Sequence, residues 1–183
     1  KACWNSRKGS AEALPARNEL TQRTIEESRA RAYLAHMAIR EILEVPDPRL
    51  KTVSTKVEPD EFGDELNTLV SDMFETMYAA PGIGLAAIQV GVPKRVLVID
   101  LQEPESDEEG APPVKNPMVF INPEILKGSD DLSVYNEGCL SVPDQFAEVE
   151  RPSVIRASWM DREGRIHEEQ LEGLLATCLQ HEM

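Results

Sequence analysis

A helical repeat of apolar residues follows Asp60. Large apolar side chains recur there at spacings of three and four residues, which is the period of one face of an α-helix. They are Phe62, Leu66, Leu69, Val70, Met73, Phe74 and Met77. Asp60 is a suitable N-cap, and Pro81 and Gly82 stop the repeat. The pattern predicts an amphipathic helix that ends near Tyr78 and packs its apolar face on a core.

Several shorter stretches have the composition of strands, with many β-branched and aromatic residues between turn residues. The predicted strands are 95–101, 118–121, 125–127, 147–150, 154–160 and 165–171. A turn at Asn122-Pro123 separates the second from the third, and residues 147–171 together predict an antiparallel meander. Residues 102–117 are acidic and rich in proline, which predicts an exposed loop.

A second helical pattern closes the sequence over residues 173–183. One face of this helix carries Leu174, Thr177, Cys178 and His181. The imidazole therefore points the same way as the apolar stripe, where it needs a polar partner. The order of helix, strands and helix predicts an α+β fold, with antiparallel sheets packed around a C-terminal helix that carries His181 and Glu182.

Composition and charge narrow the classes of function. The length of 183 residues is enough for one domain with a core. A formal net charge of −14 argues against binding a nucleic-acid backbone or an anionic membrane through a basic face. No apolar run approaches the roughly 20 residues that span a bilayer. Cys3, Cys139 and Cys178 are too few and too scattered for a disulfide framework, which indicates a reducing compartment.

The first 36 residues differ from the rest in charge. They hold 7 of the 19 basic and 4 of the 33 acidic residues, so their net charge is +3 and that of the remainder is −17. We interpret residues 1–36 as a poorly ordered leader or a non-native extension, with Met37 as the natural start of a domain over 37–183. An organellar transit peptide is a further reading, against which the four acidic residues count.

Two short features contain candidate metal ligands. His181-Glu182 is the opening of an H-E-x-x-H helix, in which two His hold a metal and the Glu handles a proton. The second His of that pattern would come two positions after Met183. Cys139 lies in the sequence EGCLS, where a thiol is presented with little bulk beside it. Taken singly, the pair reads as a solvated helix surface and Cys139 as a small buried apolar residue.

Three motifs in a fixed order change this interpretation. They are GIGLAAIQ at 82–89, EGCLS at 137–141 and LQHEM at 179–183. They resemble the signature motifs of peptide deformylases, G-x-G-x-A-A-x-Q, E-G-C-L-S and Q-H-E-x-D-H. These enzymes remove the formyl group from nascent bacterial and organellar proteins. The resemblance runs from Met37 to Met183; the last Asp and His of the third motif are absent, and residues 1–36 match no part of the pattern.

The resemblance implies a metal site of one Cys and two His. Cys139 and His181 match two of the ligands, and the third would follow Met183. The family's metal is typically Fe(II), and Zn, Ni or Co are accepted by such a donor set. We expect one divalent ion, with Fe(II) in the cell. The chain as printed is then C-terminally truncated before its third ligand, and we expect it to hold metal weakly and to have negligible activity.

The resemblance also implies the roles of the remaining site residues. Glu182 is expected to be the general base, while the Gln89 amide and the Leu140 backbone N–H stabilise charge on the formyl oxygen. An extended formyl-Met peptide is expected to pair along Ile83 and Gly84. The apolar slot for its Met side chain has the candidates Ile83, Leu174, Thr177 and Cys178, which could equally be ordinary core. Glu137 is expected to orient neighbouring groups.

Expected partners and alternatives follow from the same reading. We expect formyl-Met nascent peptides as substrates, on or off the ribosome, with no sequence-specific nucleic acid and no membrane. A monomer in the bacterial cytoplasm is expected rather than an organellar protein. One alternative is a catalytically dead, deformylase-like protein that binds peptides, and another is an unrelated metallohydrolase of the zincin kind. A His at the second position after Met183 would favour the enzyme.

Overall fold

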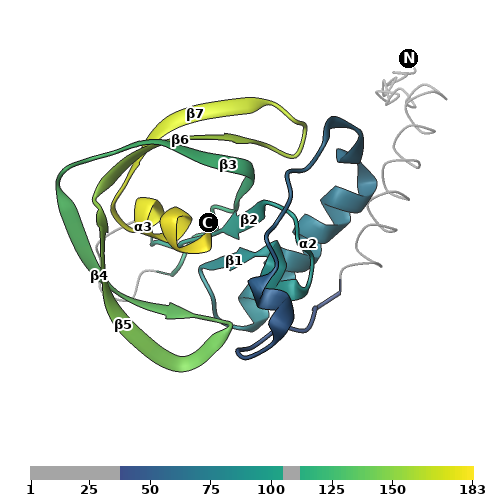
Figure 1. Cartoon of the computed structure of the whole chain (residues 1–183), viewed down its shortest axis with the longest axis horizontal. Helices are drawn as coiled ribbons and strands as arrows, with labels where there is room; N and C mark the ends of the chain where they lie inside the picture. The colour runs from purple at the N-terminus through teal and green to yellow at the C-terminus, as the bar shows by residue number, and fades with distance from the viewer. Residues whose placement is uncertain (1–37, 105–111) are drawn as a thin grey trace, which may run out of the picture. The chain divides into compact units, whose positions relative to one another are not determined.

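The computed structural model describes residues 38–104 and 112–183 (Figure 1). The predicted leader at 1–36 lies outside the described residues, as do Met37 and the middle of the predicted loop at 102–117. Within the described ranges, no helix is long and apolar enough to cross a bilayer.

Short helical turns, two α-helices and seven strands make up the described part of the chain. In chain order they are η1 (Pro48–Lys51), η2 (Pro59–Glu61), α2 (Asp64–Ala79), β1 (Gly84–Ala86), η3 (Ala87–Val90), β2 (Val96–Ile99), β3 (Met118–Gly128), β4 (Leu132–Cys139), β5 (Val142–Pro152), β6 (Val154–Met160), β7 (Ile166–Glu172) and α3 (Gly173–Glu182). The strands form a five-stranded antiparallel sheet in the order β1-β2-β3-β6-β7 and a separate antiparallel pair, β4-β5.

The five-stranded sheet lies between the two helices. Side chains alternate along β2, so Val96 and Val98 join the apolar cluster of α2, while Leu97 and Ile99 join that of α3. Each of these four side chains is at most 4% exposed, and burying one contributes about 1.5–3 kcal/mol. Figure 1 shows α2 and α3 on either side of β1 and β2. The core therefore fixes α3 against the sheet.

The predicted first helix is present as α2, but its start differs from the prediction. Asp60 is not the N-cap, because it lies in the preceding turn η2. Glu58 and Glu61 close that turn, with the Glu58 backbone N–H donating to a Glu61 carboxylate oxygen at 2.8 Å. The helix then begins after Gly63, whose backbone is extended. The hydrogen bond between Glu58 and Glu61 thus holds a separate turn, and the α-helix begins about one turn later than predicted.

The predicted meander at 147–171 is only partly correct. β6 and β7 pair as expected, but β5 begins at Val142 and pairs with β4, which the sequence did not predict. Both strands consist of exposed and half-buried residues, so neither carries an apolar run or a buried face along its whole length. The two predicted strands at 118–127 are one strand, β3, in which a left-handed Asn122 and a shift of register replace the turn.

The overall class was predicted correctly. The described chain is an α+β fold with antiparallel sheets, and α3 follows β7 directly at its C-terminal end. The helix extends over Gly173–Glu182, close to the predicted range, and its buried residues include Ala176, Cys178 and Leu179. His181 and Glu182 therefore lie on the last turn of a helix anchored in the core.

Candidate active site

A pocket of about 480 Å³ opens between β1, the end of the β4–β5 pair and α3. All three sequence motifs contribute to its walls. The predicted site residues that line it are Ile83, Gly84, Glu137, Cys139, Leu140, Leu174, Thr177, Cys178, His181 and Glu182. Gln89 does not line the pocket but contacts Cys139 from behind, with 3.6 Å between Gln89 Nε2 and Cys139 Sγ. Segments that are far apart in the sequence thus meet at one cavity.

Cys139 and His181 meet although they lie on different elements. Cys139 is the last residue of β4, and His181 belongs to the last turn of α3. A hydrogen bond with Cys139, followed by one with Glu137, raises the pKa of His181 to about 9 against the opposing effect of burial. Both side chains line the pocket, and a cysteine sulfur with a histidine ring nitrogen is a donor pair that Fe and Zn sites use. The pair fits a metal site.

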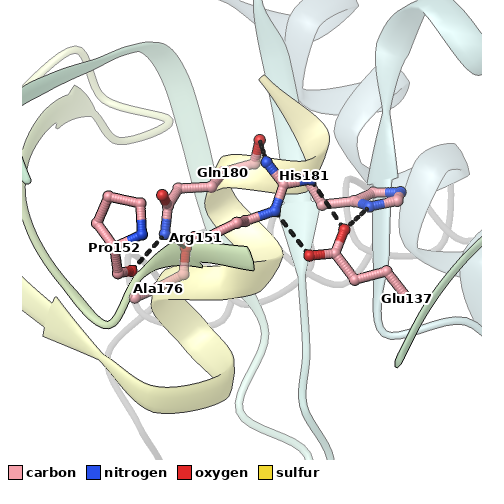
Figure 2. Close-up of polar contacts among 6 residues, drawn as sticks. All are labelled: Glu137, Arg151, Pro152, Ala176, Gln180 and His181. Carbon is pink, nitrogen blue, oxygen red and sulfur yellow. Dashed lines mark hydrogen bonds and ion pairs between the residues drawn. The ribbon is translucent and has the colours of Figure 1, made fainter. Parts of the chain in front are cut away.

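Glu137 holds the other side of the imidazole ring. The His181 Nδ1–H donates to Glu137 Oε2 at 2.7 Å, which leaves Nε2 as the ring nitrogen available to a metal. Arg151 in turn donates to both carboxylate oxygens, from Nε at 2.6 Å and from Nη2 at 2.8 Å (Figure 2). These two bonds from Arg151, with a smaller effect of His181, keep the pKa of Glu137 below its usual value. Glu137 therefore stays an acceptor.

Glu182 lies at the pocket wall beside Gly84. Burial raises the pKa of Glu182 to about 7, although the charge of His181 and a hydrogen bond from the Ala86 backbone oppose the shift. A Cβ atom at position 84 would come within 2.7 Å of Glu182 Oε1 and 2.8 Å of Cys178 Sγ. Only glycine leaves room for this carboxylate. A carboxylate with a pKa near neutrality can both accept and return a proton.

Gln89 is fixed by bonds at both ends of its amide. Its Oε1 accepts from the Ala86 N–H at 2.7 Å, and its Nε2 donates to Ser141 Oγ at 3.2 Å. The amide nitrogen consequently points toward Cys139 and Ser141, and the side chain is only 5% exposed. Leu140 lies between those two residues and lines the pocket. The two predicted oxyanion donors thus both lie next to Cys139.

The predicted substrate residues form an apolar wall. Leu174, Thr177 and Cys178 face the pocket from α3, and Ile83, 37% exposed, faces it from the segment before β1. Burial raises the pKa of Cys178 far above its usual value, so this side chain is a neutral thiol. Cys178 also belongs to the apolar cluster under α3, so it is at once core and pocket wall.

Three residues near the site were missed in the sequence. Arg151 and Gln180 lie behind His181, and Phe146 lines the pocket although its side chain is 70% exposed. The Phe146 ring covers Gly138, where a Cβ atom would come within 2.7 Å of it. The pairing of β4 with β5 brings Arg151 and Phe146 to the site, and the sequence did not predict that pairing. Gln180 directly precedes the His-Glu pair, so the sequence indicates that it lies near the site. The sequence does not indicate what its side chain contacts.

Residues 38–104 and 112–183 contain no cluster of three or more His, Cys, Asp and Glu side chains that could hold a metal ion. Cys139 and His181 are the two candidate ligands that the motif resemblance names within these ranges.

Comparison with known proteins gives one consistent family. The family model described as polypeptide deformylase matches residues 39–183. A peptide deformylase from Rhizorhabdus wittichii is 71% identical over 147 residues, covering 80% of this chain and 81% of that protein.

Solved structures agree with this result. A peptide deformylase from Legionella pneumophila has a TM-score of 0.68 and 43% identity, covering 79% of each chain. A Met-Ala-Ser-bound class I type b peptide deformylase from Acinetobacter baumannii has a TM-score of 0.71 and 32% identity, covering 80% of this chain and 91% of that one.

Proposed function

Because the chain belongs to the polypeptide deformylase family, we propose that its pocket hydrolyses the N-formyl group of formyl-Met peptides and releases formate. The proposal includes dependence on one divalent metal ion. The observation that carries it is the meeting of Cys139 and His181 at the pocket that Glu182 also lines. A cysteine and a histidine can hold a metal ion, and a carboxylate can transfer the proton in metal-assisted hydrolysis of an amide.

Cys139 and His181 would hold the metal, which we expect to be Fe(II) in the cell, with Zn, Ni and Co also accepted. When bound, the ion supplies Lewis-acid activation of a water molecule near neutral pH. Glu137 keeps the proton on His181 Nδ1 and so presents Nε2.

Glu182 moves the proton in the proposed reaction. Its pKa of about 7 lets the carboxylate accept a proton from the attacking water and later return it to the leaving amine. Gln89 and the Leu140 backbone N–H would donate to the formyl oxygen, where negative charge develops. The fixed amide of Gln89 supports this role, because an oriented donor needs no reorganisation during the reaction.

The substrate would bind as an added strand. β1 is an edge strand of its sheet, since it pairs with β2 alone, and its residue Gly84 lines the pocket. The apolar wall on α3 would receive the Met side chain. The Acinetobacter baumannii relative, solved with Met-Ala-Ser bound, supports a peptide of this kind. We further propose action on nascent chains, as a monomer in the bacterial cytoplasm; the bacterial origin of the relatives supports the last point.

The proposal is tested by formate release from formyl-Met-Ala-Ser, using a full-length chain that carries the complete third motif. Glu182→Ala should lower kcat by about 10²–10⁴-fold with unchanged metal content, because only proton transfer is removed. Glu169→Ala, an exposed carboxylate on β7, is the matched control. Full turnover by Glu182→Ala would remove Glu182 from its role. Binding of Met-Ala-Ser without formate release by the unaltered chain would favour the peptide-binding alternative.

A further inference from the structure

Arg151 on β5 and Gln180 on α3 have no role in the chemistry proposed above, yet they connect two elements that carry site residues. Arg151 makes a bidentate pair with the Glu137 carboxylate, with one hydrogen bond to each oxygen (Figure 2). Its third guanidinium nitrogen, Nη1, donates to the Gln180 backbone carbonyl at 3.4 Å. One arginine thus contacts β4 and α3 together.

Gln180 completes the connection from the helix side. Its Nε2 donates to the Pro152 carbonyl at 3.1 Å and to the Ala176 carbonyl one helical turn earlier at 2.9 Å. Two consecutive residues of β5 therefore bond to the side chain and the backbone of one helix residue. We call Arg151, Glu137, Gln180 and the Pro152 carbonyl the β5–α3 clamp.

The clamp bears on the metal pair because Cys139 and His181 belong to different layers. Cys139 ends β4, which pairs only with β5, whereas α3 is held by the core of the five-stranded sheet. The separation of sulfur and imidazole thus depends on how the two-stranded pair docks on α3. The clamp fixes that docking next to His181, and the bidentate pair with Arg151 also sets the plane of the carboxylate that His181 bonds to.

We propose that Arg151 and Gln180 are positioning residues that hold Cys139 and His181 at the separation a metal requires. This inference rests on the proposed function, in that Cys139 and His181 are taken as metal ligands. Arg151 acts through geometry as well as charge, since a planar guanidinium makes two parallel bonds that a lysine ammonium cannot. An ordinary ion pair would contribute to stability without altering metal affinity.

Co²⁺ titration of the metal-free, full-length protein tests the inference, with thiolate-to-cobalt absorption reporting ligation by Cys139. We expect Arg151→Met and Gln180→Leu each to weaken Co²⁺ affinity by about 10- to 100-fold, as loss of outer partners of metal ligands does. Arg151→Lys should recover only part of the loss and serves if Arg151→Met does not fold. Arg156→Met on β6 removes an exposed ion pair with Glu168 and is the matched control.

Each outcome of the titration has a definite meaning. Weaker Co²⁺ binding in the clamp variants, with thermal midpoints like that of Arg156→Met, supports the inference. Unchanged affinity in Arg151→Met and Gln180→Leu, with the thiolate band present in the parent, overturns the inference and leaves the proposed function intact. An equal loss of affinity in Arg156→Met overturns it as well. A parent protein without a thiolate band contradicts the proposed metal site and the inference with it.

Discussion

At the scale of single residues, one constraint on the site comes from the absence of a side chain at Gly84. Gly84 lies where any Cβ atom would collide with the Glu182 carboxylate and the Cys178 sulfur. Both of those atoms belong to α3, which the core holds against the sheet. The Glu182 carboxylate, the proposed base, therefore occupies space that a side chain at position 84 would fill.

Gly84→Ala should lower kcat for formyl-Met-Ala-Ser by about 10²-fold, because a displacement of about 1 Å of a reacting group has that effect. The thermal midpoint should also fall, since the Cys178 thiol belongs to the buried core under α3 and overpacking a core costs about 1–3 kcal/mol. Gly63→Ala is the matched control, because a Cβ atom there meets nothing within 4 Å. Unimpaired turnover by Gly84→Ala would show that Glu182 tolerates displacement.

At the scale of elements, helices and strands with a buried face were easier to predict from the sequence than exposed ones. The α2 repeat and β6 were predicted because one face of each is packed on the core, which leaves a periodic apolar pattern. β7 is mostly exposed and was predicted as the return strand of a meander. β4 and β5 were missed as a pair because their residues are exposed or half-buried throughout. Their pairing consists of the backbone ladder between the two strands, with the Phe146 ring over Gly138, and neither feature leaves a periodic pattern in the sequence.

The β6–β7 turn allows a test of stability against pH. Burial of Asp161 opposes its ionisation, but hydrogen bonds from His167 and Arg165 outweigh burial and keep its pKa well below the usual value. A lowered pKa adds stability above the unfolded value of about 3.9, and that stability is lost as the pH falls through the folded pKa.

Asp161→Asn should therefore lower the free energy of unfolding by about 1–2 kcal/mol at pH 6, since hydrogen bonds to a charged group are lost. The difference should shrink below about pH 4, where the carboxylate begins to be protonated in the unfolded state. Urea unfolding of the parent and of Asp161→Asn, at pH 6 and below about pH 4, measures this difference in the free energy of unfolding. Glu163→Gln, exposed at the same turn, should stay within about 0.5 kcal/mol of the parent. A difference for Asp161→Asn that does not vary with pH would contradict the assignment.

At the scale of the whole molecule, the fold brings together three motifs that the sequence keeps apart. The resemblance identified those motifs and the family, and the structure places ten of the eleven predicted site residues at one pocket, with Gln89 directly behind it. The β5–α3 clamp could not be predicted, because it depends on how two layers dock. Arg151 and Gln180 show no local pattern that reports a contact across layers.

The proposed binding of a catalytic metal by Cys139 and His181 is tested most directly by the metal content of the protein. Protein purified without oxygen, as a full-length chain with the complete third motif, should contain about one divalent ion per chain. Cys139→Ser should lose that ion, because the substitution removes one of the two proposed ligands. A protein that contains no metal, or a Cys139→Ser variant that keeps the full amount, would contradict the account.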